Sequence, residues 1–284
     1  MYLGQSHPQL KHSEPVELVL GAGGIKGFGH IGLLKAIEEH GINIGKITGV
    51  SVGSLVAALY TNGFSTEDLL EVFIERLGRR LDPALLARSV TIPDPLSFLI
   101  GGCVDLRPAY EELVARHGLA PNERLRIVSY DCLGHHPVVF QGSNYKLSHA
   151  LAASGAVPGV FRPIWHAGDN GGWALLVDGA LYHYNPTEFC RGQAIVSRFS
   201  QATELPSQWQ LPLDLYFHFR EMYLPLAGNR RYVDPAAHVV IDIGLPDVAG
   251  LNFGISRRKC LALVQDGYEK ACASLDQALE QGRL

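Results

Sequence analysis

Hydrophobic residues fall along the chain in short runs that predict strands, each followed by a segment with helical spacing. The β-branched runs VELVL (16–20) and KITGV (46–50) predict two strands. Apolar residues recur at helical spacing in 30–41 and 54–63, and each of these segments ends at a glycine, which predicts amphipathic helices with glycine stops. This order of elements is typical of parallel strands that are joined by helices.

The rest of the chain continues the same pattern. Helices are predicted over 65–78, 106–118, 148–158 and 257–281, and strands over 125–142 (two strands and a turn), 174–181 and 238–244. The polar residues 1–14 predict a flexible N-terminal arm, and the absence of repeats or a low-complexity linker favours one domain over 15–284. We therefore expect an α/β fold with a mixed, largely parallel central sheet.

Composition narrows the classes of function. The chain has 284 residues, of which 47% are hydrophobic and 18% are charged, and its formal net charge is −4. This length can bury a large core, and the weak negative charge argues against nucleic acid as a partner. The five cysteines form no CxxC pair, which favours free thiols in a reducing compartment. With no secretory signal and no long apolar run, we expect a cytoplasmic protein.

The stretch ITGVSVGSLVAALY (47–60) contains a Gly-x-Ser-x-Gly motif between a predicted strand and a predicted helix. A nucleophile elbow needs this context, with Gly49 and Gly53 leaving room around Ser51. The helix N-terminus also brings a positive dipole close to Ser51. The alternative is a glycine-rich turn in which Ser51 only caps the helix.

The stretch GAGGIKGFG (21–29) allows three interpretations. A dinucleotide-binding loop fits Gly21 and Gly23, but Lys26 replaces its third glycine and the second strand does not end in an acid. A P-loop needs Ser or Thr after the lysine, where this chain has Gly27. An oxyanion hole fits, because successive glycines expose backbone N–H groups. A tight turn with a solvated Lys26 also remains open.

The base that would accept a proton from Ser51 is not marked by any histidine motif. His218 and His238 occur late in the chain in apolar, strand-like runs, and the pair His135–His136 is typical of a turn. Asp178 is the better candidate, because a strand carries it to a turn that Gly179 permits, and a carboxylate can take the proton directly. The alternative is an Asp-Gly turn in which the carboxylate caps its own backbone.

Four stretches in order resemble the patatin-like phospholipases, which hydrolyse lipid acyl esters with a Ser–Asp dyad. They are GAGGIKGFGHIGLLKAIEEHGI (21–42), ITGVSVGSLVAALY (47–60), LAASGAVPGVFRPI (151–164) and LLVDGALYHYNP (175–186). The resemblance covers about 16–190 well and the C-terminal third only loosely. It implies a three-layer α/β/α sandwich.

The resemblance also implies roles for individual residues. Ser51 matches the nucleophile and Asp178 matches the base. Gly23 and Gly24 match the oxyanion glycines, and Lys26 stands where the family often has arginine. The implied reaction passes through an acyl-enzyme and uses no metal or cofactor.

Two positions depart from the family pattern. Ala22 stands where the family usually has glycine, and Ala180 follows Asp178-Gly179 where a second glycine is usual. Neither change removes the proposed nucleophile, the base or the two glycine donors.

The apolar segment 81–104, which three prolines interrupt, is a candidate lid or membrane-facing surface. The arginines at 79 and 80 precede it and the arginine at 88 lies within it, and all three suit anionic headgroups. The alternative is an ordinary buried connection.

The sequence leaves three hypotheses for function. The first is a lipid acyl hydrolase of the phospholipase A or lysophospholipase type, with peripheral contact to a lipid surface. The second is an esterase or acyltransferase that acts on soluble acyl esters with the same dyad. The third, which the missing acid after the second strand disfavours, is a non-catalytic nucleotide-binding module.

Overall fold

A computed structural model describes residues 15–76, 102, 104–168, 171–199, 232–245, 248, 250 and 255–284. The predicted arm over 1–14, His218, Cys103 and nearly all of the candidate lid over 81–104 lie outside the described residues. The arginines at 79, 80 and 88 also lie outside them.

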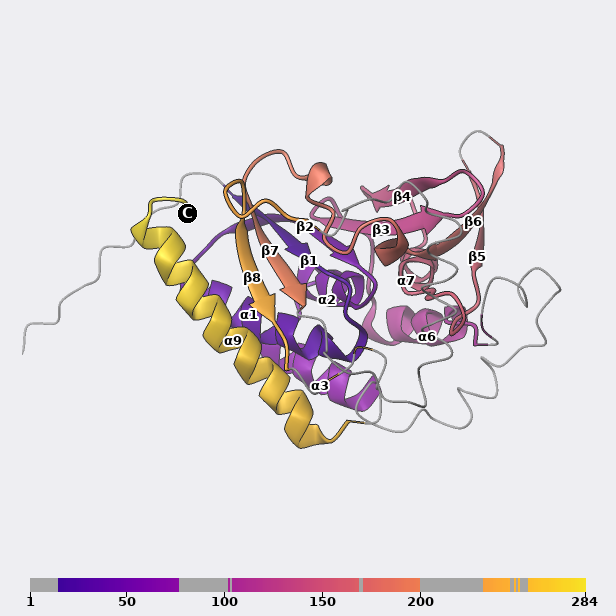
Figure 1. The fold of residues 1–284 in the computed structure, drawn as a ribbon. Helices are drawn as coiled ribbons and strands as arrows, with labels where there is room; N and C mark the ends of the chain where they lie inside the picture. Colours follow the sequence, from indigo (N-terminus) through magenta and orange to yellow (C-terminus); the bar gives the residue numbers. More distant parts are fainter. Residues whose placement is uncertain are drawn as a thin grey trace, which may run out of the picture.

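The centre of the structure is an eight-stranded sheet, whose main path runs β5-β6-β3-β2-β1-β7-β8, with β4 paired to β3 (Figure 1). Its strands are β1 (Val16–Leu20), β2 (Ile44–Val50), β3 (Leu125–Asp131), β4 (His136–Gln141), β5 (Ile164–Ala167), β6 (Trp173–Asp178), β7 (Ala194–Phe199) and β8 (Val239–Ile243). Neighbouring strands from β3 through β2, β1 and β7 to β8 are parallel, whereas β4, β5 and β6 join by antiparallel pairing. The predicted α/β class with a largely parallel central sheet is confirmed.

The helices agree with the predicted segments, with bounds that shift by a few residues. They are α1 (Phe28–Glu39), α2 (Val52–Thr61), α3 (Thr66–Arg76), α6 (Arg107–His117), α7 (Leu147–Ser154) and α9 (Arg257–Glu280), with 3-10 turns η1 (Gly24–Gly27), η2 (Gly179–Leu181) and η3 (Thr187–Phe189). The sequence did not predict β5 and β7. The four-residue β5 is an outer strand of the sheet path, whereas β7 (AIVSRF) lies within it, between β1 and β8.

The strands divide their side chains between two faces. Leu18 and Leu20 of β1 belong to the large core cluster that includes residues of α1, α2, α7 and α9. Val19, between them, points to the other face, where it packs with Val196 and Val233. Because both faces are covered here, the buried part of β1, residues 18–20, is an apolar run and does not alternate with polar residues.

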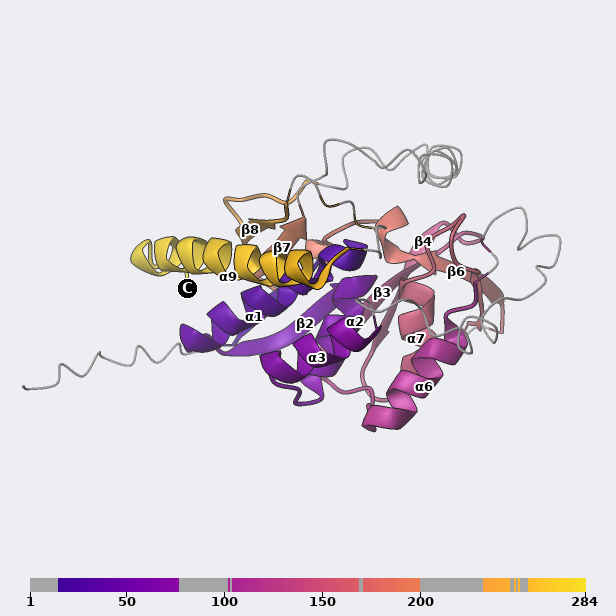
Figure 2. The ribbon, with the colours of Figure 1, turned by 90° about the horizontal axis from the view of Figure 1, so that it is seen from below.

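The first and last helices lie side by side, as both views of the ribbon show (Figures 1 and 2). A Cβ atom added at Gly32 of α1 would lie 1.9 Å from the carbonyl oxygen of Val264, and one added at Gly267 of α9 would lie 2.1 Å from that of Gly29. The two backbones therefore approach more closely than any side chain would permit.

Four cysteines in the described part of the chain, Cys132, Cys190, Cys260 and Cys272, are free thiols, as predicted for them. Among the helices of the described ranges, none combines the length and the apolar character that crossing a bilayer requires.

Candidate active site

Ser51 occupies a sharp turn between β2 and α2. Its backbone has φ 54° and ψ −123°, which is unusual for a residue with a side chain and is the kind of strain found at nucleophile elbows. Its carbonyl oxygen accepts hydrogen bonds from the Ser54 N–H at 3.0 Å and from the Ser54 hydroxyl at 2.6 Å. The sequence prediction of an elbow, with a strand before Ser51 and a helix after it, agrees with this geometry.

Asp178 ends β6 and is buried, with only 1% of its surface exposed. Its carboxylate accepts a hydrogen bond from the Ala180 N–H at 2.8 Å, and hydrogen bonding with the nearby Ser51 side chain also favours the charged carboxylate. Burial raises the pKa of Asp178 to about 7, although both hydrogen bonds act in the opposite direction. Asp178 does cap its own turn, as the alternative interpretation held, but it also lies close enough to the Ser51 side chain for that side chain to lower its pKa.

The sheet explains why these two residues meet. Along one edge of β3, β2 pairs in parallel as far as Val50 opposite Val128, and β6 pairs in antiparallel fashion from the other end as far as Asp178 opposite Ser129. The other edge of β3 is occupied by β4 over both of these stretches. The two strands therefore run toward each other along one edge of β3, and their ends bring Ser51 and Asp178 together.

The glycine-rich loop follows β1, beside the elbow. The N–H groups of Ala22, Ile25 and Lys26 donate to Tyr184 O, Gly250 O and Gly23 O respectively. Within the described ranges, no acceptor is found for the N–H groups of Gly23 and Gly24. These are the two N–H groups that the family resemblance predicts as oxyanion donors.

Gly24 has φ +55°, and a Cβ atom there would lie 2.2 Å from Gly250 O. The loop therefore needs glycine at this position for two independent reasons.

Lys26 lies in η1 and is only 4% exposed. Burial lowers the pKa of its ammonium group. The solvated lysine of the alternative interpretation is therefore wrong, because this side chain is part of the buried loop.

The three glycines that were expected to support the motifs all pack against main chain. A Cβ atom at Gly53 would lie 2.1 Å from Leu20 O, so α2 starts directly against the end of β1. A Cβ atom at Gly49 would lie 2.4 Å from the Cα of Ser54, and one at Gly179 would lie 2.3 Å from Val128 O.

His30 is a buried residue of the site region that sequence reasoning missed. Its Nε2–H donates to Gly21 O at 2.9 Å, because a carbonyl can only accept, and its Nδ1 accepts from the Ser197 hydroxyl at 2.8 Å. Burial lowers the pKa of His30 to about 4, so the ring is neutral near pH 7. His30 thus ties the glycine loop to α1 and β7. It is the first residue of a predicted helix, and nothing in the sequence marks that contact.

The other histidines considered as bases lie elsewhere in the sheet. His238 precedes β8, where its Nδ1 accepts from the Ala194 N–H at the start of β7. This is the end of the parallel strands opposite to Ser51, which follows the carboxyl end of β2. His135 is in the β3–β4 turn with φ 56°, as predicted, whereas His136, which was expected in the same turn, is the first residue of β4.

In the part of the chain that the structure describes, no group of three or more His, Cys, Asp or Glu side chains is arranged to hold a metal ion.

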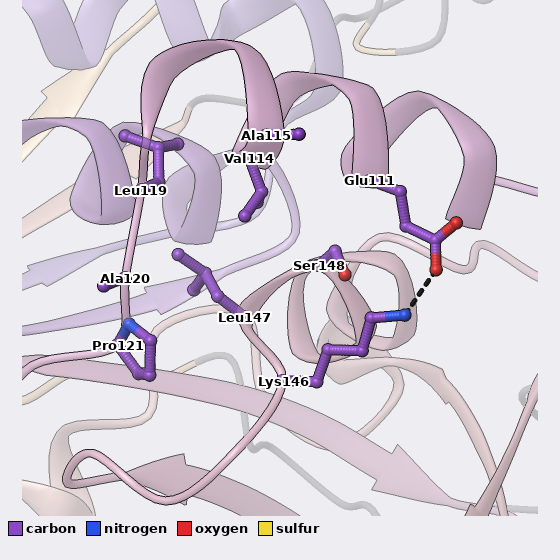
Figure 3. Close-up of a pocket in the computed structure, with 9 residues that line it drawn as sticks. All are labelled: Glu111, Val114, Ala115, Leu119, Ala120, Pro121, Lys146, Leu147 and Ser148. Atoms are coloured by element: carbon purple, nitrogen blue, oxygen red, sulfur yellow. Dashed lines mark hydrogen bonds and ion pairs between the residues drawn. The ribbon is translucent and has the colours of Figure 1, made fainter.

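A separate hollow of about 490 Å³ lies between α6 and α7 (Figure 3). Its walls are mostly apolar, and Lys146 and Glu111 form an ion pair at its side. Its lining includes none of the predicted site residues, so it is not the candidate active site.

With this geometry in place, comparison with known proteins gives the family. The model of the family described as patatin-like phospholipase matches residues 18–190, which is more than half of the chain. The chain therefore belongs to the patatin-like phospholipase family.

Particular relatives extend the comparison. The chain is 46% identical over 68 residues to "Lysophospholipase NTE1" of Eremothecium gossypii, a match that covers 23% of this chain and 4% of that protein. It is 32% identical over 179 residues to an uncharacterized NTE family protein of Mycobacterium bovis, covering 60% of this chain and 43% of the relative. The chain thus spans less than half the length of these relatives.

The fold is also similar to that of VipD from Legionella pneumophila, with a TM-score of 0.54 and 17% identity. This likeness covers 93% of this chain and 67% of the VipD chain, and it concerns the fold alone.

Proposed function

We propose that this chain is a lipid acyl hydrolase of the phospholipase A or lysophospholipase type, with Ser51 as nucleophile and Asp178 as base. The observation that carries the proposal is that Ser51, on a strained elbow, lies beside the buried Asp178 carboxyl group, whose pKa its side chain lowers. A general base works best when its pKa lies near the working pH, and the pKa of Asp178 of about 7 meets that condition.

The proposed reaction has two halves. In the first, Ser51 Oγ attacks the acyl carbonyl carbon while its proton moves to Asp178, and the N–H groups of Gly23 and Gly24 stabilise the oxyanion. The ester C–O bond then breaks, and Asp178 returns the proton to the departing alcohol or lysolipid. In the second half, Asp178 takes a proton from water, the hydroxide attacks the acyl-enzyme, and Ser51 regains its proton as the fatty acid leaves.

The substrate class rests on the family and its relatives. The family is described as phospholipases, and the Eremothecium gossypii relative is named a lysophospholipase. We extend these names to this chain as a proposal, together with residues 15–284 acting as one catalytic domain. Strands from both ends of this range contribute to the one sheet, and α9 packs on α1, which supports that extent.

The first test is covalent labelling with a fluorophosphonate probe. The wild-type chain should label at Ser51, whereas Ser51→Ala and Asp178→Asn should not. Ser148→Ala and Asp242→Asn are the matched controls, because Ser148 lines the separate hollow and Asp242 pairs with Arg198 on the surface. Both controls should label as the wild type does.

The second test assigns the substrate. Release of fatty acid from mixed phospholipid vesicles, but only slow hydrolysis of short soluble esters, would support the lipid hydrolase. The reverse preference would favour an esterase that acts on soluble acyl esters. A wild-type chain that neither labels nor hydrolyses either substrate would contradict the proposal.

A further inference from the structure

Ser154, the last residue of α7, lies at the junction where the ends of β2 and β6 meet. It belongs to the LAASGAVPGVFRPI stretch, which the proposed reaction does not use, and it is fully buried. Its hydroxyl oxygen accepts a hydrogen bond from the Ser51 N–H at 2.9 Å, and the hydroxyl donates to Val128 O at 2.7 Å.

These two contacts fix the orientation of the Ser154 hydroxyl. A hydroxyl has one proton to donate, and Val128 O can only accept, so the proton points to β3 and a lone pair faces Ser51. Val128 is the residue of β3 opposite Val50, where pairing with β2 stops. Ser154 therefore connects β3 with the main chain of the elbow.

The residues after Ser154 reach the other half of the dyad. The N–H of Asp178 donates to Ala156 O at 2.9 Å, at the point where β6 ends. One short segment, 154–156, thus hydrogen bonds to the backbones of both Ser51 and Asp178.

A strained backbone persists only where its surroundings hold it. Ser54 holds the carbonyl side of Ser51, and Ser154 holds the N–H side. Because the Ser51 N–H is already engaged by Ser154, it is not available to an oxyanion.

We infer that Ser154 is a positioning residue that fixes the elbow of Ser51 and, through the segment 154–156, its alignment with Asp178. This inference rests on the proposed function and adds to it a residue that touches no substrate.

The test compares Ser154→Ala with Ser148→Ala, a second buried serine on the same helix that has no part in the dyad. Ser154→Ala should label with fluorophosphonate about ten- to a hundredfold more slowly, since small misplacements of reacting groups have effects of that size. Ser148→Ala should label within about twofold of the wild type. Ester hydrolysis by Ser154→Ala should show a lower kcat with little change in KM.

A pH profile separates positioning from a merely structural role. The nearby Ser51 side chain lowers the pKa of Asp178, so an elbow that moves away should shift the acid limb of the pH–rate profile to higher pH in Ser154→Ala. A loss of stability alone would reduce the amount of active protein and would not change the pH at which the acid limb of the rate lies.

The outcomes are distinct. If wild type labels at Ser51 and folded Ser154→Ala labels equally fast, or shows an unmoved acid limb, the inference is overturned while the proposed function stands. If Ser154→Ala does not fold, Ser154→Cys replaces it, because a thiol keeps the volume but bonds only weakly, and the same slow labelling and shifted limb are expected. If wild type does not label at Ser51, both ideas fall.

Discussion

The charge of Asp178 should make the wild-type chain less stable as the pH rises, and Asp178→Asn should remove that effect. The carboxyl has a pKa of about 7 in the fold, compared with 3.8 for an unperturbed aspartate. Between these values the folded chain holds a proton that the unfolded chain has released, so wild-type stability falls as pH increases through the window. The asparagine variant has no such proton to lose.

The size of the effect follows from the same values. Each unit of pKa difference corresponds to about 1.4 kcal/mol, so the interval from pH 5 to pH 8 contains a loss of about 3 kcal/mol for wild type. Asp178→Asn should therefore gain about 3 kcal/mol relative to wild type on going from pH 5 to pH 8. Asparagine keeps an oxygen that can accept from the Ala180 N–H, so the comparison removes mainly the charge.

The assay is urea unfolding at pH 5, 6, 7 and 8, followed by circular dichroism, for wild type, Asp178→Asn and Ser51→Ala. Ser51→Ala removes a side chain that lowers the pKa of Asp178, so in that variant the fall in stability should continue to a higher pH than in wild type. A difference between Asp178→Asn and wild type that stays constant from pH 5 to pH 8 would refute the reasoning, because it would mean that Asp178 is already ionised at pH 5.

Three further predictions concern the same region. The fluorophosphonate labelling rate of wild type should rise about tenfold per pH unit below pH 7 and level off above it, and a limb centred near pH 4 would contradict the assignment of Asp178. Gly24→Ala should label at least tenfold more slowly and lose roughly 1–3 kcal/mol of stability. The control Gly63→Ala, with φ +89° but open space around it, should keep the wild-type labelling rate. Equal labelling rates for the two variants would refute the role of the loop. His30→Leu should lower the free energy of unfolding by roughly 2–3 kcal/mol, because Gly21 O and the Ser197 hydroxyl lose their partner. An unchanged midpoint of urea unfolding would contradict this.

Local pattern was sufficient for much of the fold and for the order of the motifs. The strand before Ser51, the helix after it and the turn at Asp178 are all properties of neighbouring residues, so the sequence predicted them. The glycines of the loop were also readable, since exposed N–H groups and a positive φ are what glycine permits.

Contacts between distant segments could not be read in the same way. That β2 and β6 would end against adjacent residues of β3 depends on pairing registers that no local pattern carries. For the same reason, no sequence motif indicated that Ser154 would bond to the Ser51 N–H or that His30 would bond to Gly21 O. The pKa of Asp178 is likewise a product of burial in the finished fold.

The close contact between α1 and α9 affects how this protein can be divided. The family match ends at residue 190, but β7, β8 and α9 all come later in the chain. A fragment cut at that boundary would expose the glycine-lined side of α1 and the open edge of β1, and it would remove Ser197, the partner of His30. The stretch recognisable as a family member is therefore shorter than the smallest piece that should fold, and engineered versions should keep α9 attached.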